Sequence, residues 1–414
     1  MALGLTLLLV QALQASPDFK SLVQQTLKQD PEFANVDFQT SVVEAQKWQG
    51  LSNLIIPRIN FNFGEYEQKN NVSLATAADK FRFGTLSASL DLFNFGSDWN
   101  NWQATRRALR AQEARVETQI IRRESEIIDL YLLATREAKN VQILEKLVKM
   151  KEEALGLSRK LMERGVLSVQ EYQKVQLDVS NSKSELLTAQ QRLKNHSAQL
   201  QAYGDQPIPT EFPWVGELTE SRIQQLFKLE AKTQELPQFK EMMEDYEASR
   251  YSARSATGVM FGSFAFNFNR SYYEFPTQEL WEWRTSLVYT LPLFDQFDQE
   301  VTRRRAVAER KIAELRQSFS EKSANAQMQA QKENLQIAWK NWLERKDALK
   351  ISQDLYRYTL RQFNSGAISV NELFVDQDRL LRTEQVANEG LYQLHSSTLA
   401  FCHSRGKAYS KNCF

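Results

Sequence analysis

The residues that could carry out catalysis are few and scattered. The 414-residue chain has three histidines, His196, His395 and His403, and none of them stands in an HExxH or other histidine–carboxylate arrangement. The sequence also has no GxSxG, P-loop or GxGxxG segment. Hydrolases, phosphate-transfer enzymes and dinucleotide-binding enzymes depend on such spacings. The sequence therefore predicts a protein that is not an enzyme and binds no cofactor.

The two cysteines, Cys402 and Cys413, lie close together near the C-terminus. Their spacing is not that of a metal-binding or redox pair. In an oxidising compartment they could form a disulfide that stabilises the fold by about 2–3 kcal/mol. Two unpaired thiols agree equally well with the sequence.

Two segments, 164–171 and 365–372, combine a glycine suited to a sharp reversal with a serine and glutamate spaced as a capping box. The residues are Gly165, Ser168 and Glu171 in the first segment, and Gly366, Ser369 and Glu372 in the second. Each segment is therefore predicted to be a tight turn that leads into a helix.

Apolar and polar residues alternate in four segments, at about 57–66, 82–93, 258–270 and 281–293. This period of two predicts strands with one apolar and one polar face. An aromatic cluster brackets the connection between the last two strands: Tyr272, Tyr273, Phe275, Trp281 and Trp283. Since both tryptophans share the apolar face, we favour an interfacial girdle in a membrane, with the loop outside the cell, over an ordinary hairpin core.

Long stretches without proline follow the strands. Residues 98–163 contain one glycine and residues 298–365 contain none. They predict helices of roughly 100 Å each, at 1.5 Å per residue. Shorter helices, at about 169–202 and 370–401, return from the turns. Apolar residues at heptad-like steps, such as Ile121, Ile128 and Leu132, suit packing against neighbouring helices.

This order of elements occurs twice. Residues 90–94 resemble 291–295 and the two turns resemble each other, in both cases at a spacing of about 200 residues. The short apolar run at the start has the length of a signal-peptide core, although no basic residue precedes it. We predict a signal peptide at 1–15, a first repeat at 16–202, a linker at 203–220, a second repeat at 221–403 and a tail at 404–414.

The charge is nearly balanced, with 52 lysines and arginines against 51 aspartates and glutamates. Binding to nucleic acid depends on a basic surface. The composition therefore argues against nucleic acid as the main partner.

Together, the twofold repeat, the Leu-Pro-Leu-Phe-Asp segment at 291–295 and the Gly-x-x-Ser-Val turns at 165–169 and 366–370 resemble the TolC family of outer-membrane efflux proteins. The resemblance covers nearly the whole chain. It implies an α+β membrane protein in which four strands per protomer join a trimeric, 12-stranded barrel in the outer membrane. Long helical hairpins would form an α-barrel across the periplasm. The strand pattern supports the same conclusion, because open sheet edges are not tolerated in lipid and require closure by further copies.

The resemblance implies a passive exit duct of a tripartite efflux or type I secretion system. The partners would be two further copies of the chain, a periplasmic adaptor protein, an inner-membrane pump and outer-membrane lipid. The turns would form the periplasmic entrance and bind the adaptor through Arg164, Gly165, Val166, Leu167, Ser168, Ser365, Gly366, Ala367, Ile368 and Ser369.

Carboxylates after the second turn would form rings that narrow this entrance. Glu372 matches the first such position in the family, Asp376 and Asp378 follow it, and Glu171 of the first turn is grouped with them. The second gate position holds Val375, and Ile368 stands where the family has a basic residue. Apolar closure by Ile368, Leu373 and Phe374 is therefore an alternative to an ionic latch. A purely capping role is the alternative for Glu372.

A different class of protein is also compatible with part of the pattern. A soluble, elongated coiled-coil scaffold with two β-hairpins would explain the helices and the balanced charge. It would not explain the four amphipathic strands.

Overall fold

The structure is a computed structural model that describes residues 31–68, 79–203, 212–215, 218–229, 231–275, 278–292, 297–365, 367–368 and 370–407. The predicted signal peptide and Cys413 lie outside these ranges. The chain forms two compact units. The sheet unit comprises Asn35–Val116 and Pro237–Lys322, and the helical unit comprises Met1–Ala34, Glu117–Leu236 and Ser323–Phe414. Each unit draws on both predicted repeats, so the division runs across the repeats rather than between them.

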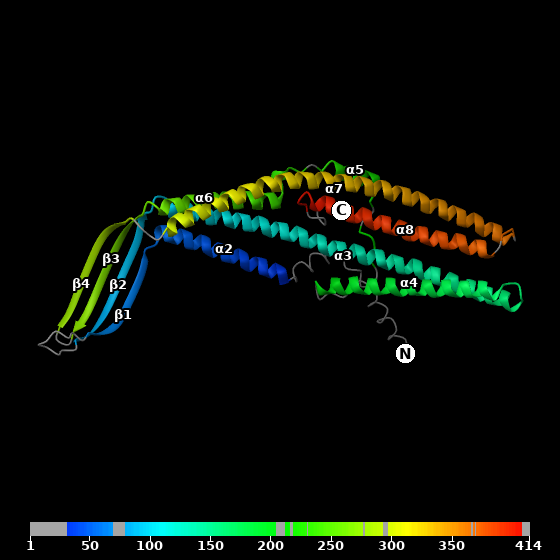
Figure 1. Ribbon diagram of the computed structural model, residues 1–414, viewed down its shortest axis with the longest axis horizontal. Helices are drawn as coiled ribbons and strands as arrows, with labels where there is room; N and C mark the ends of the chain where they lie inside the picture. The colour runs from blue at the N-terminus through cyan, green and yellow to red at the C-terminus, as the bar shows by residue number, and fades with distance from the viewer. Residues whose placement is uncertain are drawn as a thin grey trace, which may run out of the picture. The chain divides into compact units, whose positions relative to one another are not determined.

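The sheet unit contains a four-stranded antiparallel sheet in the order β1-β2-β3-β4 (Figure 1). The strands are β1 (Arg58–Gln68), β2 (Asp79–Phe93), β3 (Ser263–Phe275) and β4 (Gln278–Thr290). Sequential strands are neighbours, and β2 and β3, which come from different repeats, form the central pair.

The third strand begins later than the sequence suggests. Residues 258–262 were expected in the strand, but α6 (Pro237–Val259) continues into them and Gly262 makes the turn. Gly262 has a φ of +84°, and a Cβ there would collide with the carbonyl oxygen of Thr290. Only glycine fits this close approach of two chain segments. The fourth strand likewise ends at Thr290 instead of about 293.

Helices adjoin the sheet within the same unit. They are α2 (Pro31–Ile55), α6, and the first parts of α3 (Ser97–Glu163) and α7 (Asp298–Asn364). Half-buried ion pairs join α3 to α6: Arg107 Nη1 lies 2.9 Å from Glu244 Oε2, and Arg115 Nε lies 2.8 Å from Glu241 Oε1. The helix expected at 17–50 is described from Pro31 and extends to Ile55.

The helical unit consists mainly of two hairpins. The second part of α3 runs back into α4 (Val169–Ala202), and the second part of α7 runs back into α8 (Val370–His403) (Figure 1). The α3 and α7 helices have 67 residues each, in agreement with the long stretches free of proline. Within the described part of the chain, no helix is both long and apolar enough to cross a bilayer.

The segment predicted as a linker contributes to the core of the helical unit. Phe212, Val215 and Leu218 are buried, at every third position, and they pack with residues of α5 (Glu220–Phe227) and the long helices. Tyr131 on α3 donates a hydrogen bond to the Pro213 carbonyl oxygen at 3.1 Å. The hydrogen bond to Pro213 thus helps to hold a segment whose apolar side chains face inward. Although its composition is typical of a linker, this segment is packed in the core.

The same core includes the C-terminal end of α8. Phe401 and Cys402 are 0% and 1% exposed, and Cys402 is not a free thiol. The pairing of Cys402 with Cys413 stays a prediction because Cys413 lies outside the described residues.

Candidate functional site

Strand register separates the side chains of the sheet into two chemically distinct faces. Residues directly opposite one another in antiparallel strands share a face. On one face, here called the apolar face, the register brings together Ile59, Phe61, Phe63, Leu86, Ala88, Leu90, Phe264, Phe266, Phe268, Tyr272, Trp281, Trp283, Leu287 and Tyr289. On the other, the polar face, it brings together Asn60, Asn62, Thr85, Ser87, Ser89, Asn267, Asn269, Ser271, Glu282, Arg284 and Ser286.

The apolar face is largely uncovered in the single chain. Phe61, Leu287 and Trp283 are 69%, 66% and 73% exposed. Fully burying one such side chain contributes about 1.5–3 kcal/mol. An apolar surface that continues across four strands therefore indicates a surface that contacts lipid or protein.

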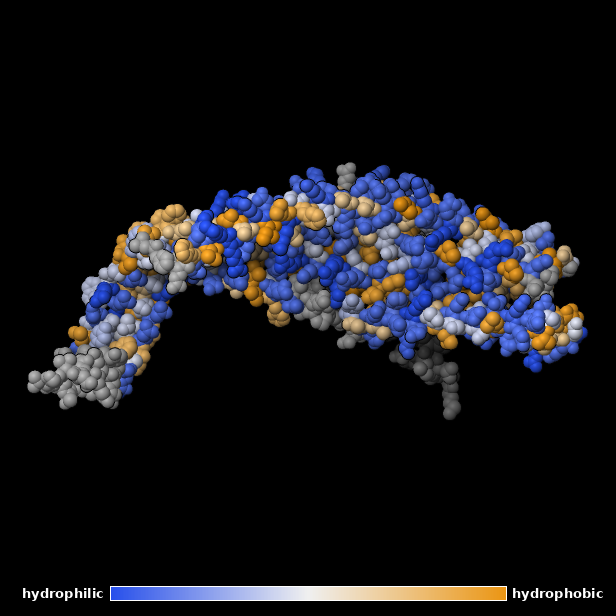
Figure 2. All heavy atoms as spheres, in the orientation of Figure 1, coloured by the Kyte–Doolittle hydropathy of each residue, from blue (hydrophilic) through white to orange (hydrophobic). Residues whose placement is uncertain are grey.

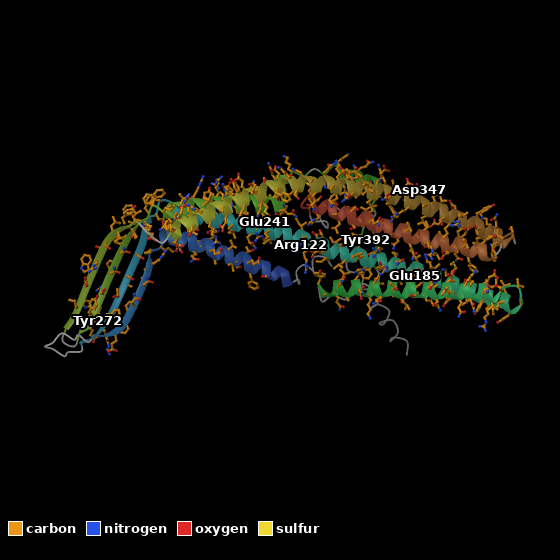
Figure 3. The ribbon with its side chains drawn as sticks, viewed as in Figure 1. Arg122, Glu185, Glu241, Tyr272, Asp347 and Tyr392 are labelled. Carbon is orange, nitrogen blue, oxygen red and sulfur yellow. The ribbon has the colours of Figure 1, made fainter. Side chains whose placement is uncertain are left out.

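The aromatic residues at the loop end of β3 and β4 do not all share this face. The rings of Tyr272 and Trp281 lie 4.6 Å apart between centroids, and Tyr272 stands near the end of the strands that is farther from α6 (Figure 3). Tyr273 is opposite Leu280 in the register and therefore lies on the other face. The side chain of Phe275 is outside the described part. Tyr272, Trp281 and Trp283 share the apolar face, and the girdle itself stays a prediction.

Two strands of the sheet have an open edge. Among the described strands, β1 pairs with β2 alone and β4 pairs with β3 alone. The strands have 11, 15, 13 and 13 residues. About 9–11 residues suffice for a tilted strand to cross a bilayer.

In the helical unit, the first predicted turn closes the α3–α4 hairpin. Gly165 has a φ of +75°, its N–H donates to the Met162 carbonyl at 2.9 Å, and the Val166 N–H donates to the Leu161 carbonyl at 3.0 Å. These are the two bonds of a Schellman motif. The turn presents apolar side chains to solvent: Val166 and Val169 are exposed, and Figure 2 shows hydrophobic residues at this tip.

The capping box predicted at this turn is present. Ser168 Oγ accepts from the Glu171 N–H at 3.2 Å, and Glu171 Oε2 accepts from the Ser168 N–H at 3.1 Å. Hydrogen bonds from the backbone and hydroxyl of Ser168 lower the pKa of the Glu171 carboxyl. Glu171 is therefore held as an anion at the N-terminus of α4. Arg164 and Leu167 complete the turn.

The second turn repeats part of this geometry. The Ala367 N–H donates to the Gln362 carbonyl at 2.9 Å, which is equivalent to the bond between Val166 and Leu161. Ser365 and Ala367 are exposed and Ile368 is half-buried. Gly366 and Ser369 lie outside the described residues, so the cap predicted there stays a prediction.

The predicted gate residues on α8 differ in their surroundings. Glu372 and Val375 are exposed, whereas Leu373 is buried and Phe374 packs against a cluster of apolar residues from α3, α4 and α8. Asp376 Oδ2 accepts a hydrogen bond from the Thr359 hydroxyl of α7 at 2.6 Å, and its Oδ1 accepts from Arg379 at 2.7 Å. Leu373 is thus part of the packing that holds α8.

Asp378 joins helices of the two hairpins. Its Oδ2 lies 2.8 Å from Arg382 Nε, and its Oδ1 lies 3.3 Å from Lys151 Nζ on α3. The side-chain exposures are 28% for Asp378, 15% for Lys151 and 53% for Arg382, so the pair with Lys151 is the more buried one. These residues border a cavity of about 270 Å³ that is lined by residues of α3, α4 and α8: Met150, Lys151, Ala154, Ser158, Val175, Asp178, Phe374, Val375, Asp378 and Arg382.

Sequence reasoning missed Lys151, Arg382 and Thr359 as partners of these carboxylates. The spacing of Asp378 and Arg382, four residues apart on one helix, could have suggested their pair. Nothing in the sequence signals that Lys151, on the other hairpin, is the second partner.

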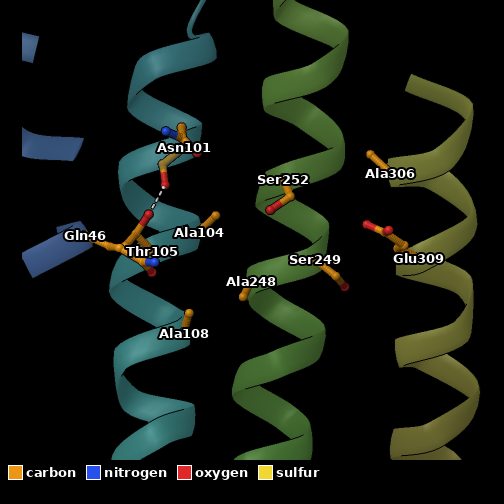
Figure 4. Close-up of a pocket in the computed structure, with 10 residues that line it drawn as sticks. All are labelled: Gln46, Asn101, Ala104, Thr105, Ala108, Ala248, Ser249, Ser252, Ala306 and Glu309. Carbon is orange, nitrogen blue, oxygen red and sulfur yellow. Dashed lines mark hydrogen bonds between the residues drawn. The ribbon is translucent and has the colours of Figure 1, made fainter. Parts of the chain in front are cut away.

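A second hollow, in the sheet unit, has a volume of about 290 Å³ and is lined mainly by small side chains (Figure 4). Ala104 and Ala108 of α3 face Ala248 and Ser252 of α6 across it. Its carboxylate, Glu309 on α7, is 2.9 Å from Arg305. No group of three or more histidines, cysteines or carboxylates suited to a metal occurs among the described residues.

Comparisons with known proteins cover the first repeat in sequence and nearly the whole chain in fold. The family model described as outer membrane efflux protein matches residues 22–204, which is nearly all of the first repeat. No curated protein sequence matches the chain.

Solved structures resemble the whole fold. The CmeC outer membrane channel of Campylobacter jejuni is 12% identical, with a TM-score of 0.82 over 93% of this chain and 84% of that one. VceC of Vibrio cholerae is 13% identical, with a TM-score of 0.77 over 94% and 96%. The open state of MtrE of Neisseria gonorrhoeae is 13% identical, with a TM-score of 0.77 over 94% and 89%. These findings confirm the resemblance to the TolC family and the predicted fold class of helical hairpins with four strands.

Proposed function

We propose that this chain, which resembles the outer membrane efflux protein family in sequence and outer-membrane channels in fold, is itself an outer-membrane efflux channel. In the finer proposal, three copies form one passive duct across the outer membrane and periplasm. The observation that carries the proposal is the four-stranded sheet, which has one apolar face, one polar face and two open edges.

Closure by copies follows from the strand order. In a four-stranded antiparallel sheet, β1 and β4 run in opposite directions. The open edge of β4 can therefore pair with β1 of the next copy, and the antiparallel pattern continues around a ring. Three copies would give 12 strands, an even number within the range of outer-membrane barrels. Closure satisfies the edge N–H and C=O groups that lipid could not.

The two faces then have separate roles. The apolar face would contact hydrocarbon, while the polar face, with residues such as Asn62, Asn267 and Ser286, would line a water-filled interior. The sheet thus supplies both surfaces that a pore in a bilayer requires.

The helical hairpins would form the periplasmic entrance. The exposed valines at the first turn, Val166 and Val169, and the equivalent Ala367 offer a small apolar surface to an adaptor protein. The sequence offers no nucleotide-binding segment, so the energy for export would come from a partner pump in the inner membrane.

The main test is the purified protein in detergent. We expect the mass of a trimer, and discrete conductance steps when the protein is added to a planar lipid bilayer. Release from membranes by high salt without detergent, together with a monomeric mass and no conductance, would instead support the soluble scaffold.

At the entrance, we propose that the pair of Asp378 with Lys151 holds the two hairpins together in a closed state. Replacing Asp378 with asparagine would remove the charge that Lys151 contacts. Because removing one partner of a largely buried ion pair leaves the other charge uncompensated, the open fraction of single channels should rise about tenfold or more. Asp354→Asn is the control, because Asp354 is exposed and pairs only along its own helix, with Arg357 at 3.4 Å. Equal gating in both variants would show that the pair of Asp378 with Lys151 does not hold the channel closed.

For Glu372, the predicted ring of carboxylates is tested by ion preference. Glu372→Gln keeps a side chain that can cap the helix and removes the charge; Glu372→Lys reverses it. We expect cation preference to fall in the first variant and to fall further in the second, because three copies would face one another around an axis. Unchanged conductance and ion preference in both variants would leave Glu372 with a capping role alone.

A further inference from the structure

One charged residue interrupts the apolar face of the sheet. Between the row of Tyr272 and Trp281 and the row of Phe264 and Tyr289, Arg270 is the one charged residue that the register places on this face among the described residues. Its neighbours in the register are apolar: Leu86 on one side and Trp283 on the other. A cation at such a position needs a reason, because an arginine facing hydrocarbon is unfavourable.

The Arg270 side chain bends toward the loop end of the strands. Its guanidinium lies over the ring of Trp281, 4.9 Å from the centroid, although its register partner is Trp283. In the part of the chain that the structure describes, Arg270 forms no ion pair or side-chain hydrogen bond besides this ring contact, and it is exposed. The guanidinium donors therefore remain available.

Beyond Tyr272 and Trp281, the next row of this face toward the loop end is charged, with Glu65, Glu274 and Glu279 around Arg82. Glu274 stands opposite Arg82 in the register. Among the described residues none of these carboxylates forms an ion pair with Arg270, whose guanidinium lies beside the aromatic rings one row away.

The depth of this residue in a bilayer follows from the register. The eight residues from Trp281 to Tyr289 span about 27 Å along the strand at 3.4 Å per residue, or about 20 Å along the bilayer normal at a strand tilt near 40°. This is close to the height of the apolar band of such barrels, about 25 Å. Arg270 is therefore about one row inside the outer edge of the band, within reach of the headgroups by the bend described above.

The end of the strands that carries Arg270 is the end away from the helices. α6 leads into β3 at one end and β3 connects to β4 at the other. If the helices extend into the periplasm, as the proposed function holds, the loop end and Arg270 face the outer leaflet.

We propose that Arg270, Tyr272 and Trp281 form a binding site for an anionic, phosphate-bearing lipid headgroup of the outer leaflet. The inference rests on the proposed function. The planar guanidinium matches two phosphate oxygens in a fork, and Trp281 both orients it and occupies the interface. The acyl chains would lie along the neighbouring apolar rows, such as Phe268 and Phe266, which lead away from the headgroup down the same strand.

The test uses the full-length protein in a neutral detergent, with native mass spectrometry to count bound lipid. Phosphatidylglycerol is the anionic probe, phosphatidylcholine the zwitterionic one, and inorganic phosphate a headgroup without chains. We expect phosphatidylglycerol to bind more tightly than phosphatidylcholine, and inorganic phosphate not to displace it. Arg270→Gln should weaken binding of phosphatidylglycerol about tenfold, since a charged hydrogen-bond donor is lost.

Arg284→Gln is the matched control. Arg284 is one residue from Trp283, so it lies near the same depth, but it is on the polar face and contacts Glu282 at 3.1 Å. Its replacement should change binding less than twofold. Equal binding by wild type and Arg270→Gln, or equal losses in both variants, would overturn the proposal. So would full displacement by inorganic phosphate, which would indicate an anion site.

Arg270→Lys provides a second readout, since it keeps the charge but loses the paired donors of the guanidinium. We expect its affinity for phosphatidylglycerol to lie between those of the wild type and Arg270→Gln. Conductance of the same preparations separates this proposal from the proposed function. Lipid binding that depends on Arg270 in a protein without conductance would reject the channel and keep the lipid site. Normal conductance, with lipid binding that does not depend on Arg270, would support the channel and reject the lipid site.

Discussion

Replacing Leu287 with arginine is expected to abolish most of the membrane-inserted oligomer. Leu287 is 66% exposed and lies on the apolar face opposite Phe266, one row inside the row of Phe264 and Tyr289. An arginine on the lipid face of a barrel strand costs up to about 2–4 kcal/mol, and the cost falls toward the edges of the bilayer. In a ring of three copies this free-energy cost would arise three times. The sum would be large enough to prevent stable insertion of the oligomer.

Ser286→Arg provides the control one residue away. Ser286 lies on the polar face, opposite Asn267. An arginine there would face the aqueous interior and leave the oligomer intact. The measurement is the amount of oligomer extracted from membranes by detergent, at equal expression. If Leu287→Arg were extracted as an oligomer as well as Ser286→Arg is, the apolar face would not be the surface that contacts lipid.

The free energy of unfolding of the helical unit is expected to fall as the pH is lowered from about 7.5 to 4, chiefly because of His395. This side chain is 1% exposed and stacks on Trp214, with 5.1 Å between ring centroids. Burial lowers the pKa of its imidazole to about 4, from 6.5. Above pH 6.5 the histidine is neutral in both the folded and the unfolded chain, so its burial carries no penalty for a charge.

Below pH 6.5, the His395 imidazole binds a proton in the unfolded chain but stays neutral in the folded chain. Stability is therefore lost progressively down to the folded pKa, by about 3 kcal/mol in total, since each pKa unit corresponds to 1.36 kcal/mol. Burial also lowers the pKa of His403, which adds a loss of the same sign. Burial raises the pKa of Asp129, which opposes it near the acid end of this range.

The measurement is the urea midpoint of the helical unit at several pH values, followed by tryptophan fluorescence. In His395→Gln, which cannot titrate, the midpoint should depend less on pH between 6.5 and 4, whatever its value at pH 7.5. A variant with the same slope as the wild type would show that another group causes the pH dependence.

The features that sequence analysis predicted correctly are local ones. Alternation with a period of two predicted which residues of a strand share a face, because successive strand side chains point to opposite sides. The absence of proline predicted the two 67-residue helices. The capping box at Ser168 and Glu171 was readable because all its partners lie within four residues of one another.

The errors also have a common cause. Gly262 was assigned to a strand because its neighbours alternate, yet the approach of Thr290 decides the conformation there. Residues 203–220 have a linker's composition, but Val215 and its neighbours are buried by helices distant in sequence.

The sequence by itself determined the elements, their duplicated order and the two-faced character of the strands, since each depends on residues a few positions apart. The tertiary structure alone decided which strands pair, how Asp378 meets Lys151 on another hairpin, and that Arg270 stands beside Trp281 within an apolar surface. Such contacts join residues far apart in the chain, where no local spacing records which side chain will be the neighbour. They form only when the helices pack and the strands settle into one register.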